Sequence, residues 1–229
     1  MNTENLKKIA AEKATESVKS GMIVGLGTGS TVYYALLKLG DMVREGLDIV
    51  GIPTSAGTEE IAIAQQIPLT TLASHPTIDL TIDGADEVDA RLNLIKGGGA
   101  AFVREKIIAN ASKRILIVVD ESKVSSVLGT VFPLPVEIVQ FGWEATQTEV
   151  NRICGRSTLR LAPSQDGNQQ PLITDNGNYI LDCHFNSIPA PEQVELQLNN
   201  IPGVVENGIF VNRADKIIIG TPSGIRYME

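Results

Sequence analysis

The first half of the chain alternates between short apolar runs and longer segments in which apolar residues have a helical spacing. Between Asn5 and Ser20 they recur every three or four residues, which predicts a helix that Gly21 ends. Met22–Leu26 is an apolar run typical of a buried strand. The other elements predicted up to residue 119 are helices over 31–39 (ended by Gly40), 57–66 and 100–111, and strands over 48–53, 68–72, 78–82, 92–95 and 114–119. Strands that alternate with helices in this way indicate a parallel sheet covered on both faces.

The order of predicted elements changes after about Gly129. The pattern predicts strands over 134–139, 158–161 and 203–205, helices over 143–154 and 191–199, and a hairpin of 172–174 with 179–184 around Asn176-Gly177. This β-α-β-β-α-β order is that of a ferredoxin-like unit. The apolar segments 208–211 and 216–220 are expected to return to the main sheet. We therefore expect a main domain of residues 1–130 and 205–229, and a smaller domain of residues 131–204.

Composition narrows the range of partners. The 229 residues include 19 Lys and Arg against 27 Asp and Glu, a formal net charge of −8. Without a basic stripe the phosphate contacts that nucleic-acid binding needs are poorly supplied, so no nucleic-acid partner is expected. The first residues lack the apolar core of a signal peptide, and no apolar run approaches the length of a membrane span. These features predict a cytoplasmic protein with no membrane partner.

The cysteines and histidines offer little chemistry. Cys154 and Cys183 are the only cysteines, which suits a reducing compartment and gives no zinc spacing. We expect both thiols to be buried and inert. His75 and His184 lie far in the sequence from the glycine and carboxylate segments described next, so we expect them to be structural.

A glycine-rich loop, Gly25-Leu26-Gly27-Thr28-Gly29-Ser30-Thr31, joins a predicted strand to a predicted helix. Backbone N–H groups and hydroxyls in such a loop can converge on an anion at the helix N-terminus. A dinucleotide fingerprint needs glycine in place of Ser30 and an acid at the end of the next strand, where residues 52–54 are Ile-Pro-Thr. The lysine of a nucleoside-triphosphate loop is also absent after Gly29, so we expect a phosphate monoester and no NAD. The alternative is a tight turn that merely needs glycine.

Charged residues follow the later apolar runs. Asp83 and Asp86 come directly after one run and Lys96 after the next, at positions where α/β proteins place catalytic groups. The two aspartates could hold a divalent metal, accept hydrogen bonds from sugar hydroxyls or transfer protons. Lys96 favours a metal-free site because its ammonium competes for the same oxygens. The alternative is a solvated acidic loop, and we expect Glu87 and Asp89 to face water in this way.

Three glycines follow Lys96 directly, and a glutamate lies in the predicted helix after them. Gly97-Gly98-Gly99 lets the main chain approach a ligand closely and present successive N–H groups. Glu105 lies in the second turn of the predicted helix, and a carboxylate there that faced a pocket would have its pKa raised by desolvation toward the range of a base. Because Arg104 and Lys106 flank it, the helical pattern alone favours an ordinary surface glutamate.

Together the segments LGTGST, TIDGADEVD, LIKGGGAAFVREKI, FPLPVEI, TDNGN and IPGVV closely resemble ribose-5-phosphate isomerase of the A type. The resemblance runs from the first helix to the C-terminus. It implies reversible conversion of D-ribose 5-phosphate to D-ribulose 5-phosphate in the pentose phosphate pathway, through an enediolate and with no metal or organic cofactor. It also implies a homodimer or homotetramer. The expected fold class is α/β, with a Rossmann-like parallel-sheet main domain and a smaller ferredoxin-like α+β domain.

The resemblance also implies which residues form the site. Substrate binding falls on Thr28, Gly29, Ser30, Thr31, Asp83, Gly84, Ala85, Asp86, Lys96, Gly97, Gly98, Gly99 and Lys123. The family's proton-transferring glutamate falls on Glu105, which reverses the interpretation from the helical pattern. We expect Lys96 to stabilise charge on the sugar oxygens, Asp83 to shuttle protons during ring opening, and Asp86 to orient hydroxyls or the lysine. Lys7 is a further candidate near the phosphate.

Two other functions suit a sugar-phosphate-binding α/β fold. A non-catalytic sensor is the main alternative, although the sequence shows no attached DNA-binding segment. A sugar-phosphate deaminase or lactonase would be expected to use a histidine, and none lies in the motifs.

Overall fold

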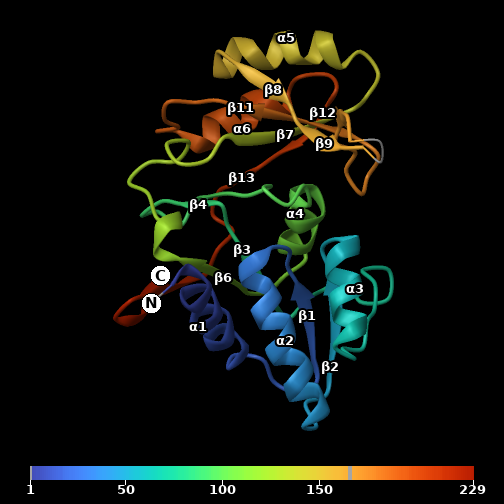
Figure 1. Ribbon diagram of the computed structural model, residues 1–229, viewed down its shortest axis with the longest axis vertical. Coiled ribbons are helices and arrows are strands. Elements are labelled where there is room, and N and C mark those ends of the chain that lie inside the picture. The colour runs from blue at the N-terminus through green and yellow to red at the C-terminus, as the bar shows by residue number, and fades with distance from the viewer. Residues whose placement is uncertain (1, 165–166) are drawn as a thin grey trace.

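A computed structural model describes residues 2–164 and 167–229, and Figure 1 shows a main sheet in its lower half and a smaller sheet above it. The main sheet contains, in spatial order, β15 (Gly224–Met228), β14 (Lys216–Thr221), β6 (Ile115–Asp120), β3 (Leu80–Gly84), β1 (Met22–Leu26) and β2 (Ile49–Pro53). Its helices are α1 (Thr3–Thr15), α2 (Ser30–Arg44), α3 (Ala56–Ala64) and α4 (Phe102–Asn110). Within the described residues, no helix is both long enough and apolar enough to cross a membrane.

The strand order creates a natural ligand position. All pairs in the main sheet are parallel except that of β14 with the edge strand β15. The chain runs outward from β1 to β2 and then returns across β1 to β3, so its direction reverses between β1 and β3. In doubly wound sheets, ligands bind at the carboxyl ends of the strands beside such a switch point. The fold therefore places the loop after Leu26 next to the loop after Gly84.

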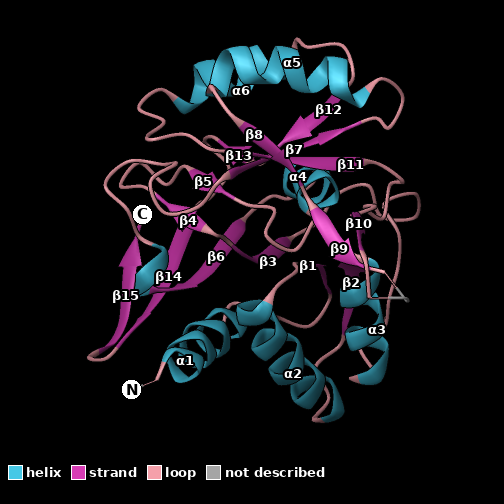
Figure 2. Cartoon of the chain, turned by 45° about the horizontal axis from the view of Figure 1, so that its top comes forward, coloured by secondary structure: helices cyan, strands magenta, loops and turns pink. Residues whose placement is uncertain are grey.

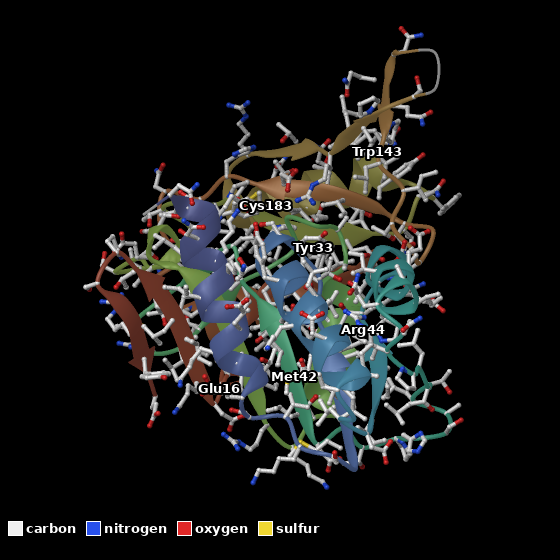
Figure 3. The ribbon with its side chains drawn as sticks, turned by 60° about the horizontal axis from the view of Figure 1, so that its bottom comes forward. Glu16, Tyr33, Met42, Arg44, Trp143 and Cys183 are labelled. Carbon is white, nitrogen blue, oxygen red and sulfur yellow. The ribbon has the colours of Figure 1, made fainter. Side chains whose placement is uncertain are left out.

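Alternate residues of each strand pack on opposite faces of the main sheet. On β6, Leu116 and Val118 belong to the same core as α1 and α2, which lie in front of the sheet in Figure 3. Ile115, Ile117 and Val119 pack on the other face with residues of α4. The sheet is thus covered on both sides, as the sequence pattern predicts.

The smaller sheet has the spatial order β12-β7-β11-β8, with every neighbouring pair antiparallel. Its elements, in chain order, are β7 (Leu134–Ile138), α5 (Trp143–Cys154), β8 (Ser157–Leu159), β11 (Tyr179–Cys183), α6 (Pro191–Asn199) and β12 (Val204–Asn207). This is the predicted β-α-β-β-α-β order of a ferredoxin-like unit. The helices α5 and α6 lie along one face of the sheet (Figure 2), and Val150 and Leu198 join its core. Cys154 and Cys183 are buried in that core, as expected.

A third sheet lies between the other two. It consists of β4 (Glu87–Val88), β5 (Leu94–Ile95) and β13 (Ile209–Phe210), with β5 in the centre. Ile95 and Ile209 pack in the core of the smaller sheet, whereas Leu94 and Phe210 pack against the main sheet. The prediction that residues 208–211 return to the main sheet is therefore wrong, because β13 pairs with β5 instead.

The predicted hairpin around Asn176-Gly177 is also wrong as a strand pair. The turn itself forms, with the Thr174 N–H donating to the Asn178 carbonyl at 2.9 Å. However, β11 is an inner strand whose two edges pair with β7 and β8, so no edge is left for residues 172–174. The hairpin of this region is β9 (Leu161–Pro163) with β10 (Gln169–Pro171).

Three smaller predictions need correction. The predicted strand over 68–72 is reduced to one parallel bridge between Gly51 and Leu69. The first helix ends before Gly21, at Thr15. Gly40 does not end α2, because it lies inside the helix, where a β-carbon would lie 2.7 Å from Cβ of Gln65. Gly40 therefore permits close packing.

Glu87 and Asp89 do not face water, contrary to prediction. The Glu87 side chain is fully buried, and its Oε2 accepts hydrogen bonds from the N–H groups of Gly129 at 3.0 Å and Phe132 at 3.2 Å. Its Oε1 accepts from the Thr130 hydroxyl at 3.1 Å. Asp89 is buried too, and accepts from the N–H of Asn93 at 2.9 Å. Both carboxylates accept from loop N–H groups, of which those of Gly129 and Asn93 are buried and would otherwise have no partner.

This arrangement gives a stability prediction for Glu87→Ala. Removing the carboxylate leaves the buried N–H of Gly129 and the partly buried N–H groups of Thr130, Val131 and Phe132 without this acceptor, so the free energy of unfolding should fall by about 3 kcal/mol. Urea denaturation checks this, with Glu60→Ala on the exposed face of α3 as the control. Equal stability of Glu87→Ala and Glu60→Ala would contradict it.

Candidate active site

One pocket opens at the switch point between β1 and β3, with an empty volume of about 470 Å³. It is lined by Thr28, Gly29, Ser30, Thr31, Gly84, Ala85, Asp86, Lys96, Gly97, Gly99, Glu105 and Lys123. The structure thus brings together Glu105 and the predicted substrate-binding residues, and all of them except Asp83 and Gly98 line the pocket. These two lie directly behind the lining, Asp83 against Lys96 and Gly98 against Asp86.

Gly27 and Gly29 of the first loop must be glycine for two different physical reasons. A β-carbon on Gly27 would lie 2.2 Å from Oδ1 of Asp83, so any side chain there would displace the aspartate. Gly29 precedes α2 with a φ of 122°, which favours glycine. Ser30 and Thr31 then begin the helix, whose first N–H groups have no acceptor within the helix. These N–H groups and the positive end of the helix dipole form a site suited to an anion.

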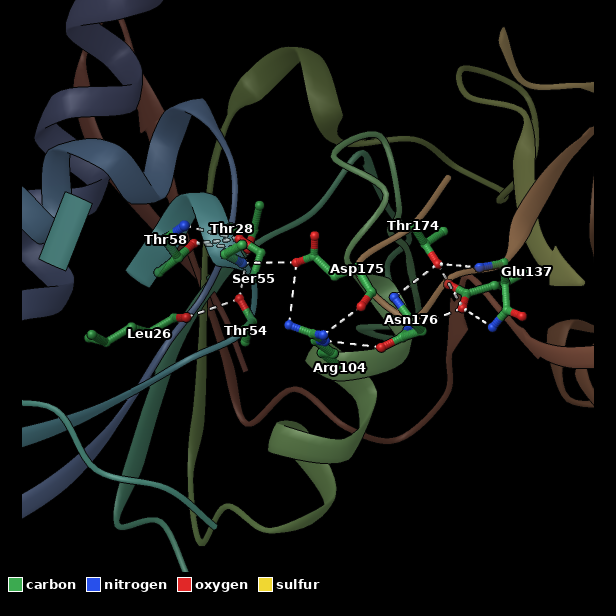
Figure 4. A network of polar contacts seen from close by, with 12 residues as sticks. Leu26, Thr28, Thr54, Ser55, Thr58, Arg104, Glu137, Thr174, Asp175 and Asn176 are labelled. Atoms are coloured by element: carbon green, nitrogen blue, oxygen red, sulfur yellow. Dashed lines mark hydrogen bonds and ion pairs between the residues drawn. The ribbon is translucent and has the colours of Figure 1, made fainter. Parts of the chain in front are cut away.

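The side chain of Thr28 holds this loop in place. Its hydroxyl lies 2.7 Å from the Thr54 hydroxyl, 2.8 Å from that of Ser55 and 3.0 Å from that of Thr58. Thr54 in turn donates to the Leu26 carbonyl at 3.0 Å. Figure 4 shows this cluster, which ties the end of β1 to the end of β2 and the start of α3. The glycine loop is therefore anchored to the neighbouring strand β2 and to α3.

At the base of the pocket, Lys96 lies between two carboxylates. Its Nζ is 3.0 Å from Oδ2 of Asp83 and 3.1 Å from Oε2 of Glu105, and it donates to the Gly84 carbonyl at 2.6 Å. All three ionisable side chains are at least 95% buried. The ammonium is thus held by one hydrogen bond and two ion pairs, which fixes the lysine's orientation.

Different elements position the members of this trio. Asp83 belongs to β3, Lys96 follows β5, and Glu105 lies in the first turn of α4. The Lys96 N–H donates to the Gly208 carbonyl at 2.9 Å, and a β-carbon on Gly208 would come within 2.2 Å of the Lys96 carbonyl. The Phe210 ring centre lies 5.6 Å from Nζ of Lys96. The sequence pattern does not identify Gly208 and Phe210, although a glycine before an apolar pair is the signal that could have found them.

Burial changes the acidity of the trio. It raises the pKa of Glu105 to about 8, with the Asp83 carboxylate adding to the rise and Lys96 opposing it. Burial also raises the pKa of Asp83, against the effect of Lys96. For Lys96, burial alone would lower the pKa, but the charges of Asp83 and Glu105 outweigh it and raise the pKa. The lysine is therefore a permanent cation, whereas Glu105 can gain or lose a proton near neutral pH.

Glu105 also has an unoccupied hydrogen-bonding position. Among the described residues, its Oε2 has no hydrogen-bond donor with suitable geometry, although the Lys96 ammonium is close. A buried carboxylate oxygen of this kind in a pocket wall can accept a proton from a bound molecule.

The second aspartate holds the glycine run. Oδ2 of Asp86 accepts a hydrogen bond of 2.7 Å from the Gly98 N–H, and a β-carbon on Gly98 would lie 2.6 Å from its Oδ1. Gly97 has a φ of 117°, a conformation that favours glycine. Gly98 is therefore required for steric reasons and Gly97 for its backbone conformation.

Lys123 and Lys7 are the two other lysines that the resemblance suggests for the site, and of these two Lys123 lines the pocket. It ends the 3₁₀ turn Glu121–Lys123, which Asp120 caps by accepting the Ser122 N–H at 3.0 Å. Lys7 pairs with Glu4 at 2.8 Å on α1 and is not among the lining residues. His75 and His184 make hydrogen bonds with Thr70 and Thr158 outside the pocket.

Comparison with known proteins identifies the family. Residues 50–224 match the profile of the family described as ribose 5-phosphate isomerase A (phosphoriboisomerase A). The chain belongs to the ribose 5-phosphate isomerase A family. Ribose-5-phosphate isomerase A of Bacillus mycoides is 50% identical over 223 residues, covering 97% of this chain and 98% of that protein. The Pyrococcus abyssi isomerase is 46% identical over 231 residues, with both chains fully covered.

Solved structures agree with this membership. A D-ribose-5-phosphate isomerase in complex with phospho-erythronic acid superposes with a TM-score of 0.94 at 43% identity, and each chain is covered completely. The family resemblance predicted from the motifs and the expected fold class are confirmed. As a member of this family, the chain is an isomerase enzyme.

Proposed function

We propose that the chain interconverts D-ribose 5-phosphate and D-ribulose 5-phosphate through an enediolate, as a step of the pentose phosphate pathway. The observation that carries this proposal is the buried trio of Lys96, Asp83 and Glu105 at the base of a pocket that also contains the N-terminus of α2. Family membership supports the reaction, and the phospho-erythronic acid complex of a relative supports a phosphorylated ligand. A cytoplasmic location, a homodimer or homotetramer and the division into two domains are part of the same proposal.

The phosphate binds at the start of α2. The free N–H groups of the first turn, the hydroxyls of Ser30 and Thr31, and the Lys123 ammonium provide donors and positive charge for a phosphate monoester. Anchoring the ester end directs the aldehyde end of the pentose toward the base of the pocket. Such fixed orientation converts binding energy into a correct alignment of the reacting carbons.

Glu105 transfers the proton. Its carboxylate removes the hydrogen from C2 of the open-chain aldose, the released electron pair forms the C1–C2 double bond, and the aldehyde oxygen takes the negative charge. Protonation of that oxygen, loss of the O2 proton and return of the Glu105 proton to C1 complete the ketose. A general base contributes a factor of about 10² to 10⁴ to the rate when its pKa lies near the working pH. The raised pKa of Glu105 meets that condition.

Lys96 stabilises the charge that develops on the sugar oxygens. Its ammonium is held by Asp83 and Gly84 and does not need to reorganise during the reaction. Asp83 assists the proton movements of ring opening, and Asp86 orients hydroxyls while holding the glycine run.

The pH dependence of the reaction follows from the raised pKa of Glu105. The base must be ionised, so kcat/KM should rise with pH through an apparent pKa near 8, which belongs to the coupled trio. Initial rates between pH 6 and 10, with substrate well below KM, measure this profile. A rate that is constant between pH 6 and 9 would contradict it.

The proposed function is tested by adding purified protein to ribose 5-phosphate in the presence of a chelator and observing the sugar by NMR. Signals of ribulose 5-phosphate should grow until the aldose and ketose reach equilibrium. Saturable binding of ribose 5-phosphate without any ketose would instead support the sensor function.

A further inference from the structure

Arg160 links the smaller sheet to the active site. It lies between β8 and β9, and its side chain is 13% exposed. The Nε group donates to Oδ2 of Asp182 on β11 at 2.9 Å, and Nη2 donates to the other oxygen of the same carboxylate. The remaining nitrogen, Nη1, donates to the carbonyl of Gly97 at 2.6 Å. The planar guanidinium thus joins a carboxylate of the smaller sheet to the glycine run of the pocket.

The Gly97 carbonyl belongs to the same peptide unit as the Gly98 N–H. Because a trans peptide is planar, its carbonyl and its N–H point in opposite directions. The N–H end of this unit donates to Oδ2 of Asp86 at 2.7 Å. One rigid peptide is therefore held at both ends, by Arg160 on the oxygen and by Asp86 on the nitrogen. A hydrogen bond at one end also polarises the peptide and strengthens the bond at the other.

The backbone of the glycine run 97–99 needs the hydrogen bonds that Arg160 and Asp86 make with it. Glycine loses more conformational freedom on ordering than any other residue, and three glycines occur in succession here. The smaller sheet contributes no residue to the pocket lining among the residues that are described. Its contact with the pocket through Arg160 is therefore a means by which it can act on the reaction without touching substrate.

We propose that Arg160 is a positioning residue of the isomerisation, oriented by Asp182 and acting through the Gly97–Gly98 peptide on Asp86. This inference rests on the proposed isomerase function. A displacement of about 1 Å in a catalytic group can cost a factor of about 10² in rate. Loss of Arg160 should therefore lower kcat/KM by about that factor, although the residue does not line the pocket.

The test compares Arg160→Met with Arg152→Met, which removes an exposed cation of α5 that pairs with Glu149. Initial rates with ribose 5-phosphate and melting temperatures are measured for both variants and the wild type. Arg160→Met should lose about 10² in kcat/KM and Arg152→Met less than about 3-fold. In Arg160→Ala, added guanidinium at millimolar concentration should restore part of the lost rate. Wild-type kcat/KM in Arg160→Met would overturn the proposal.

A double variant separates positioning from a general structural role. If Arg160 acts through Asp86, then Arg160→Met should reduce kcat/KM much less in an Asp86→Asn background than alone. Fully multiplicative losses would overturn the proposal. Should Arg160→Met fail to fold, Arg160→Lys takes its place. One ammonium cannot hold both the Asp182 carboxylate and the Gly97 carbonyl, so a loss of about 10-fold in kcat/KM is expected. Wild-type kcat/KM in Arg160→Lys would again overturn the inference. The wild type in the same assay tests the proposed function separately, since only its inactivity would refute that function.

Discussion

Glu105→Gln should lower kcat by a factor of about 10² to 10⁴, because the amide fills the same space but cannot accept a proton from carbon. Lys96 also pairs with Asp83 at 3.0 Å, a contact that the substitution does not remove, so the pocket is expected to keep its shape and its cation. Affinity for ribose 5-phosphate, measured by calorimetric titration, should therefore change little. Steady-state rates give kcat.

The control is Glu60→Gln, which makes the same chemical change on the exposed face of α3. It should retain full turnover. If Glu105→Gln also kept full turnover, another group would have to be the base.

The same variant should differ from the wild type in its stability as pH changes. The pKa of Glu105 in the folded chain is about 8, above the ordinary 4.5, so the folded state keeps a proton that the unfolded state releases. Stability contributed by this group is complete below about pH 4.5 and is lost as pH rises toward 8. Relative to Glu105→Gln, the melting temperature of the wild type should therefore fall across this interval. An unchanged difference in melting temperature would contradict the raised pKa.

Lys96→Met should affect both activity and stability. Methionine fills much of the same volume but leaves Asp83 and Glu105 without the cation that separates them. Removing one partner of a buried ionic group costs about 3 to 5 kcal/mol of unfolding free energy. Losing the stabiliser of the enediolate should reduce kcat/KM by about 10² to 10³. Urea denaturation and initial rates measure the two effects.

A second substitution distinguishes these effects. Asp83→Asn in the Lys96→Met background removes a buried carboxylate that has lost its cation, so it should recover part of the stability but none of the activity. Lys113→Met, which disrupts an exposed pair with Asp79, serves as the control and should have wild-type activity. Recovery of turnover in the double variant would show that Lys96 only keeps the carboxylates apart.

Much of the site can be predicted from the sequence because its parts are local. Strands end in buried apolar residues, and the polar residues that follow must lie at the carboxyl edge of a parallel sheet. The order of strands and loops along the chain is therefore enough to place Thr28 near Asp83. Lys96 is different, because it follows β5 of the third, antiparallel sheet, and its place beside Asp83 depends on how that sheet packs. The proposed role of Glu105 does not follow from the helical pattern, since its flanking charges suggest a surface position, and it is the family resemblance that predicts it.

The features of the fold and of the site that the sequence does not predict depend on contacts between distant segments. The acidic neighbours of Glu87 predict that it faces water, but the loop 129–132 that it supports lies more than forty residues away. Gly208 and Arg160 reach the site from the second half of the chain. The apolar pair after Gly208 is visible in the sequence, but it does not show that Gly208 packs against Lys96, and nothing local indicates that Arg160 holds Gly97. Only the tertiary contacts of the smaller sheet and of β13 bring them there.

The most direct test of proton transfer by Glu105 follows the hydrogen itself. Ribose 5-phosphate is incubated in D₂O with wild type or Glu105→Gln, and deuterium at C1 of the ketose is measured by NMR. The wild type should introduce deuterium at C1 over repeated turnovers, and Glu105→Gln should do so more slowly by the same factor as its loss of kcat. Deuterium incorporation by Glu105→Gln at the wild-type rate would contradict the assignment of Glu105 as the base.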